Sequence, residues 1–130
     1  MTVLVACNDS LHGEAALKAG IAEAARRRLP LAVLMLNPGD TTPPALAAHL
    51  ADLPPGMAAP TITFRAESAE PSDAILDQAE AVHATLVVVG ARKRSSQGTF
   101  VMGTTTQRVL LDAAAPVLVV KSTYDVPATD

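Results

Sequence analysis

Continuous apolar segments alternate with segments of helical periodicity along most of the chain. The apolar segments are five or six residues long and rich in Val and Leu, as is typical of strands buried on both faces. They lie at residues 3–7, 31–36, 61–65, 85–89 and 116–120. Only segment 61–65 alternates polar and apolar residues, so we expect it near an edge of the sheet.

Between these strands, apolar residues recur at three- and four-residue spacing, which predicts amphipathic helices. The predicted helices cover residues 11–28, 44–53, 71–82 and 105–112. Ser10 is expected to cap the first helix, with Glu14 in its first turn. Thr104 and Gln107 have the spacing of a capping box, which predicts Thr104 as the cap of the last helix.

This order of elements predicts an α/β fold, a doubly wound parallel sheet with helices on both faces. Such a sheet binds ligands beyond the carboxyl ends of its strands, where the strand order switches. Asn8, Asp9, Asn37 and Gly90 all follow strands and are expected at that edge. We predict a single domain over residues 1–121 and a C-terminal tail, 122–130, that frays because it lacks apolar periodicity.

Composition narrows the classes of function. A net charge of −3 gives no reason to expect nucleic acid as a partner. The single cysteine, Cys7, excludes a disulfide framework and is predicted to be a small buried core residue. No apolar run approaches the ~20 residues of a membrane span. The chain begins directly with a strand, so we expect a cytoplasmic protein without membrane contact.

The segment from Gly90 to Thr104 joins a buried strand to a helix and is rich in glycine and basic residues. Backbone N–H groups and the dipole at a helix N-terminus attract anions, so phosphate is the expected ligand. Gly90 would permit close approach of backbone and ligand, and Gly103 and Thr104 would donate N–H groups. Further charge and hydroxyl groups could come from Arg92, Lys93, Arg94, Ser95 and Ser96. The alternative is that Gly90 only permits a turn and Thr104 only caps the helix.

Motifs of better-defined enzymes are missing from the sequence. Neither a Walker A loop nor a dinucleotide-binding glycine pattern occurs. No Ser-His-Asp order or pair of catalytic carboxylates is evident. His12 follows the first strand near the expected ligand edge, and we expect it at the surface.

One extended motif points to a family. Its pattern is Gly, two residues, Gly, nine residues, Gly and then Ser or Thr. Gly90, Gly103 and Thr104 match its first, third and last positions with the spacing intact, and Lys93 replaces the second glycine. Together with residues 3–10 and 107–120, this motif resembles the universal stress protein family over nearly the whole chain.

The resemblance implies a flavodoxin-like or Rossmann-like fold, related to the adenine nucleotide alpha hydrolases, with a five-stranded sheet of order 3-2-1-4-5. It also implies a homodimer, often formed by antiparallel pairing of the last strands, here Val117–Val120. Some members of the family bind ATP and others do not. ATP, with or without Mg²⁺, is therefore the implied cofactor.

The family's nucleotide positions carry over residue by residue. Asn8 and Asp9 match the end of the first strand, where the family has Asp-Gly and contacts the nucleoside. Leu36 and its neighbour Met35 match the flank of the adenine pocket. The phosphate positions are Gly90, Lys93, Gly103, Thr104 and Thr105.

Three functions remain open. The first is a nucleotide-binding regulatory module that acts as a homodimer in a stress response. The second is a dimeric interaction scaffold without ATP, because Lys93 could block backbone approach as readily as it could bring a cation to a phosphate. The third is a slow ATPase, which would need a carboxylate near the loop, and only Asp9 is a candidate.

Overall fold

The computed structural model describes residues 1–93 and 100–125. Every predicted strand and helix is present, with small differences at the ends. The elements are β1 (Thr2–Cys7), α1 (Leu11–Arg27), β2 (Leu31–Met35), α2 (Pro44–Ala51), β3 (Thr61–Phe64), α3 (Pro71–Ala81), β4 (Ala84–Lys93), β5 (Phe100–Val101), α4 (Thr104–Asp112) and β6 (Val117–Lys121).

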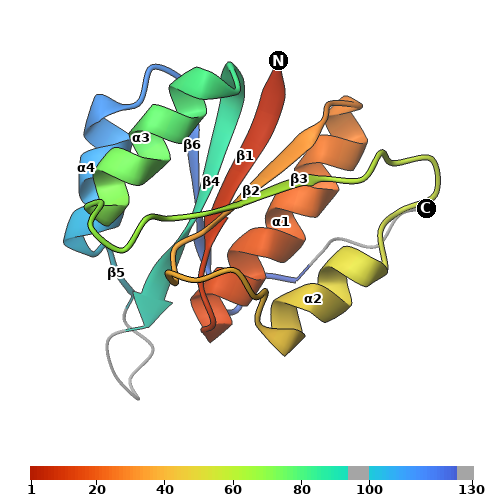
Figure 1. The fold of residues 1–130 in the computed structure, drawn as a ribbon, viewed down its shortest axis with the longest axis horizontal. Coiled ribbons are helices and arrows are strands. Elements are labelled where there is room, and N and C mark those ends of the chain that lie inside the picture. Colours follow the sequence, from red (N-terminus) through yellow and green to blue (C-terminus); the bar gives the residue numbers. More distant parts are fainter. Residues whose placement is uncertain (94–99, 126–130) are drawn as a thin grey trace.

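Strands β3, β2, β1, β4 and β6 pair in that order, and all of these pairs are parallel (Figure 1). Because β6 is the fifth strand predicted from the sequence, the expected order 3-2-1-4-5 is confirmed. The expected edge position of β3 is confirmed as well.

The largest departure from the sequence prediction is at β4. This strand was expected to end at Val89 but continues to Lys93, where it pairs with the short antiparallel strand β5. The basic residues that follow Val89 look like a loop in the sequence because they lack apolar alternation. Their backbone nevertheless pairs, since β5 returns alongside them.

Helices α1 and α2 cover one face of the sheet, and α3 and α4 cover the other (Figure 1). Successive residues of β1 point to opposite faces, so Val3 and Val5 pack against α1 whereas Leu4 and Ala6 pack with α3 and α4. Aromatic residues make up 2% of the chain, so both cores are built almost entirely from aliphatic side chains.

Cys7 is a core residue, as predicted. It is 1% exposed, and burial raises the pKa of its thiol to about 12. Its Sγ lies 3.8 Å from Sδ of Met35, which is also fully buried. Met35 therefore belongs to the core between β2 and α1.

The first helix is capped as the sequence predicts. Ser10 Oγ accepts a hydrogen bond from the Gly13 N–H at 3.0 Å. The helix ends at Arg28, whose φ of 56° places it in the left-handed region.

Part of the predicted tail is ordered against the core. Tyr124 packs on the cluster between the sheet and α1, and its N–H bonds to the carbonyl of Lys121 at 2.9 Å. Lys18 on α1 lies 3.7 Å from the carboxylate of Asp125. Among the described residues, no helix is long and apolar enough to cross a membrane.

Candidate functional site

A cavity of about 340 Å³ opens at the carboxyl ends of the central strands, between the N-termini of α1 and α4. This is the edge at which doubly wound sheets bind ligands. The cavity is lined by Ala6, Cys7, Asn8, His12, Gly13, Leu36, Asn37, Arg65, Pro71, Ile75, Val89, Gly90, Arg92, Gly103, Thr104, Thr105 and Thr106.

Most of the site residues predicted from the sequence meet at this cavity. Those that line it are Asn8, Leu36, Gly90, Gly103, Thr104 and Thr105. Asp9 is exposed and is not among the lining residues. Lys93 pairs with Phe100 through its backbone, and its side chain lies outside the described part of the structure. Arg94, Ser95 and Ser96 also lie outside it.

The N-terminus of α4 differs from the prediction. Gly103 is the cap, in an extended conformation, and Thr104 is the first helical residue, so the predicted cap at Thr104 is wrong. The first backbone bond of the helix runs from Gln107 N–H to the Gly103 carbonyl at 2.9 Å. A glycine offers no side-chain acceptor, and within residues 1–93 and 100–125 no side-chain cap bond is present at this helix start. The N–H groups of its first turn are therefore open to an anion.

Gly90 lines the cavity from within a strand. It lies inside β4, paired with Val120, so the interpretation as a turn after the strand is wrong. A Cβ at this position would lie 2.5 Å from the carbonyl oxygen of His12. The carbonyl of Gly90 accepts a bond from Thr106 Oγ1 at 3.3 Å. Gly90 thus lets the first turns of α1 and α4 approach the same point of the sheet.

Asn8 is held by the N-terminus of α1. Its Oδ1 accepts a short hydrogen bond from Ser10 Oγ, and its carbonyl accepts the Ser10 N–H at 2.9 Å. A Cβ on Gly13 would lie 2.2 Å from that carbonyl, so glycine is required there for this loop to pack on the helix. With Oδ1 committed to Ser10, the Nδ2 group of Asn8 is left to donate to a ligand.

Arg92 brings a positive charge to the N-terminus of α4. Its Nη2 lies 3.4 Å from the position that a Cβ of Gly103 would take. His12 is half-buried beside it, and burial, together with the charge of Arg92, lowers the pKa of the imidazole. No Asp or Glu is among the described residues that line the cavity. The cavity is therefore suited to an anionic ligand.

Arg65, which directly follows β3, also lines the cavity. Its Nε donates to the carbonyl of Leu36 at 2.8 Å, and its Nη1 donates to the carbonyl of Ala69 at 2.6 Å. The first bond holds the segment after β3 against the end of β2, and the second stabilises the turn of that segment itself. Leu36 is further held by its own N–H, which bonds to the Cys7 carbonyl at 2.9 Å.

Sequence reasoning missed Arg65 and His12 as lining residues. Arg65 follows β3 directly, and the rule that placed Asn8 at the carboxyl edge would have placed Arg65 there too. His12 was expected at the surface, whereas its backbone contact with Gly90 brings it to the cavity wall. Nothing in the sequence marks that contact.

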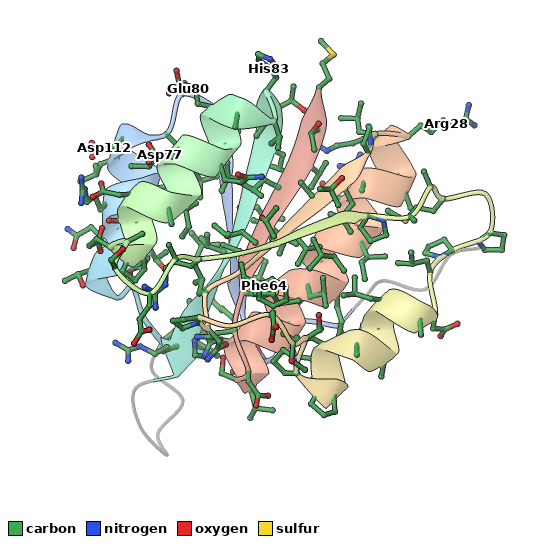
Figure 2. All side chains as sticks on the ribbon, in the orientation of Figure 1. Arg28, Phe64, Asp77, Glu80, His83 and Asp112 are labelled. Carbon is green, nitrogen blue, oxygen red and sulfur yellow. The ribbon has the colours of Figure 1, made fainter. Side chains whose placement is uncertain are left out.

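Acidic side chains gather at the other end of the molecule. A second hollow, of about 450 Å³, lies between the C-terminal ends of α3 and α4 and includes Asp77, Glu80, His83 and Asp112 (Figure 2). Among the described residues, no cluster of three or more His, Cys, Asp or Glu side chains could hold a metal ion. The described lining of this second hollow includes three carboxylates, whereas that of the first cavity includes two arginines and no carboxylate.

Comparison with known families gives one match over most of the chain. The model of the universal stress protein family matches residues 1–121. A universal stress protein of Mycolicibacterium smegmatis is 30% identical over 129 residues, which are 92% of this chain and 96% of the relative.

Solved structures show the same fold. A universal stress protein from Archaeoglobus fulgidus superposes with a TM-score of 0.69 at 28% identity, covering 93% of this chain and 98% of that one. A universal stress protein from Archaeoglobus fulgidus in complex with dAMP gives a TM-score of 0.64 at 24% identity, with 93% and 98% covered. A universal stress protein in complex with cAMP gives 0.66 at 19%, with 95% and 98% covered. At these identities, the likenesses to the two complexes establish the shared fold.

Proposed function

The chain belongs to the universal stress protein family, and from this premise we propose that it is a regulatory module that binds an adenine nucleotide, with ATP as the ligand. The observation that carries the proposal is the uncapped N-terminus of α4 with the Arg92 guanidinium beside it. Both attract negative charge, and phosphate oxygens can accept hydrogen bonds from both at once.

The cavity offers a place for each part of a nucleotide. The phosphates would lie against the N–H groups of Thr104 and Thr105 and against Arg92. The ribose would accept a bond from Asn8 Nδ2, and the base would lie beside Leu36 at the end of β2. The dAMP and cAMP complexes of the relatives support an adenine base. ATP itself is supported by the spacing of the glycine motif from Gly90 to Thr104.

Nucleotide retention fits this cavity better than hydrolysis. Hydrolysis needs a group that orients or deprotonates the attacking water, and a carboxylate often provides it. The described lining residues include no carboxylate, and the only sequence candidate, Asp9, lies outside the lining. We therefore propose a role in which the bound nucleotide acts as a signal in a stress response.

We also propose that two copies assemble through β6. This strand is at the edge of the sheet and pairs with β4 on one side. Its Leu118 is 38% exposed. An apolar edge strand tends to pair with another chain unless it is covered, so antiparallel pairing with a second copy would satisfy both the backbone and Leu118.

Calorimetric titration of the nucleotide-stripped protein tests the proposed ligand. We expect ATP to bind with a dissociation constant in the micromolar range and GTP to bind at least about tenfold more weakly, which corresponds to about 1.4 kcal/mol. Gly103→Val should abolish binding, because the side chain would crowd the phosphate position and Arg92. Ala51→Val, on the exposed end of α2, is the matched control and should bind normally.

The circular dichroism spectrum of Gly103→Val should match that of the original protein, because a Cβ at this position meets only a flexible side chain. If the stripped protein binds no adenine nucleotide, the proposal is wrong and the scaffold function takes its place. Equal binding by Gly103→Val would show that the ligand does not lie at the N-terminus of α4.

A further inference from the structure

Several sources of positive charge converge on the phosphate end of the cavity. The Arg92 guanidinium lies at the N-terminus of α4, where the helix dipole is itself positive. His12 lies close enough for the charge of Arg92 to affect its protonation. Within residues 1–93 and 100–125, no carboxylate forms an ion pair with Arg92, whereas Arg26, Arg27 and Arg108 all have acidic partners.

This arrangement is unfavourable until an anion arrives. Like charges that lie a few ångströms apart repel one another, and a helix N-terminus adds to the repulsion. A ligand with several negative charges removes the repulsion and gains charge-assisted hydrogen bonds from the guanidinium. The site therefore favours the ligand form that carries the most negative charge.

The same residues suit a magnesium ion poorly. Mg²⁺ is bound by oxygen atoms, usually with one or two carboxylates beside the phosphates. The described lining residues include no carboxylate, and Asn8 Oδ1 already accepts a bond from Ser10. A divalent cation next to Arg92 would add to the positive charge already present.

We propose that this chain binds the metal-free form of its nucleotide. The Arg92 guanidinium neutralises the phosphate charge that a divalent cation neutralises in sites that bind the magnesium complex. The inference rests on the proposed nucleotide function and narrows its ligand to the uncomplexed polyphosphate. The planar fork of arginine can bridge oxygens of two phosphates, which a point charge does less well. Arg92 is suited to this because β5 pairs with its backbone and so fixes its position.

The test is a titration of the full chain with ATP, once in EDTA and once in excess Mg²⁺. We expect tight binding in EDTA and binding weaker by about fivefold or more in Mg²⁺, because the complexed nucleotide carries less negative charge. Arg92→Met should weaken binding in EDTA by about tenfold or more, the usual size of a charge-assisted hydrogen bond. The affinity of Arg92→Lys for ATP in EDTA should lie between those of the original protein and Arg92→Met, because lysine keeps the positive charge but loses the planar guanidinium fork.

Arg26→Met is the matched control, because it removes the same charge from the far end of α1, where the side chain is exposed. It should leave both titrations unchanged. Binding by the original protein only in Mg²⁺, or equal binding by Arg92→Met in EDTA, would overturn the inference and leave the proposed function intact. Failure to bind ATP in either buffer would overturn both.

Discussion

Gly90 and Gly103 belong to one sequence motif but have different structural roles. Gly90 is in a strand, with the His12 carbonyl where its Cβ would be. Gly103 is a helix cap, and the nearest atom to its Cβ position is Nη2 of Arg92 at 3.4 Å. The first glycine is needed for packing between elements, whereas the second keeps the helix N-terminus open to the ligand.

Alanine at these two positions should therefore separate stability from binding. Gly90→Ala should lower the free energy of unfolding by about 1–3 kcal/mol, because a backbone carbonyl must move to admit the methyl group. Gly103→Ala should cost less than about 1 kcal/mol, because a flexible side chain can move instead. Urea unfolding measures both, and a larger loss for Gly103→Ala would contradict these roles.

His12 should make nucleotide binding depend on pH. Burial first, and then the charge of Arg92, hold the pKa of its folded-state imidazole below the usual value of 6.5. Without ligand, the fold loses stability as the pH falls from that value toward the folded-state pKa, because the unfolded state binds the proton better. A bound phosphate favours the protonated imidazole and raises its pKa, so affinity for ATP should rise on acidification.

Titrations between about pH 8 and about pH 6 check this expectation. The ligand's own protonation affects every variant equally, so the useful quantity is the difference between the original protein and His12→Gln. We expect the affinity of the original protein to rise more steeply as the pH falls. Parallel pH profiles would show that His12 does not contact the bound phosphate.

At the scale of elements, the site depends on where two helices begin. The Ser10 cap starts α1 and also bonds to Asn8, so one side chain sets both the helix end and the orientation of the amide that we propose contacts the nucleoside. At α4 the cap is a glycine, and the helix N-terminus stays open. The start of α1 thus has a side-chain cap within the protein, whereas the N–H groups at the start of α4 are available to the proposed ligand.

Removing the Ser10 hydroxyl should affect folding and binding together. Ser10→Ala should lower the free energy of unfolding by about 1 kcal/mol, the usual loss at an N-cap. It should also weaken ATP binding, because Asn8 loses the bond that orients its amide. Ser68→Ala, in an exposed loop, is the control for both measurements. Unchanged affinity in a destabilised Ser10→Ala would mean that Asn8 does not depend on Ser10.

The length of β4 shows the limit of reading elements from hydrophobic pattern. Val87, Val88 and Val89 identify the buried part of the strand in the sequence. The extension through Arg92 has no such pattern because it is not buried on both faces. Its backbone is extended because β6 pairs with it as far as Ala91 and β5 pairs with Arg92 and Lys93, and both pairings join residues that are not adjacent in the sequence.

At the scale of the whole molecule, the two hollows at opposite ends of the sheet differ in the charge of the residues that line them. The cavity at the carboxyl ends of the strands holds Arg65 and Arg92, whereas Glu80 and Asp112 lie near the opposite end, at the ends of α3 and α4 (Figure 2). The net charge of −3 is a sum over the whole chain and does not reveal that one cavity is basic. An anionic ligand is attracted to the cavity and repelled from the acidic second hollow.

The proposed dimer is tested best at Leu118. Its neighbour Val119 packs against the core under α3 and α4, so a charge there would also disturb the fold. Leu118 is exposed on β6. Leu118→Arg should convert a dimer to a monomer in sedimentation velocity with little change in the unfolding midpoint. A dimer that persists in this variant would point to another surface.

The sequence by itself determined the elements, their order and their layers, because hydrophobic period and strand–helix alternation are local properties of the chain. It also placed Asn8, Asn37 and Gly90 at the carboxyl edge of the sheet, since the ends of parallel strands meet there, and the family resemblance added Leu36 and Gly103. Only the tertiary structure decided that His12 touches Gly90, that Arg92 lies at the start of α4, and that Gly103 rather than Thr104 is the cap. Each of these depends on distant segments that meet in space, and no local pattern records such a meeting.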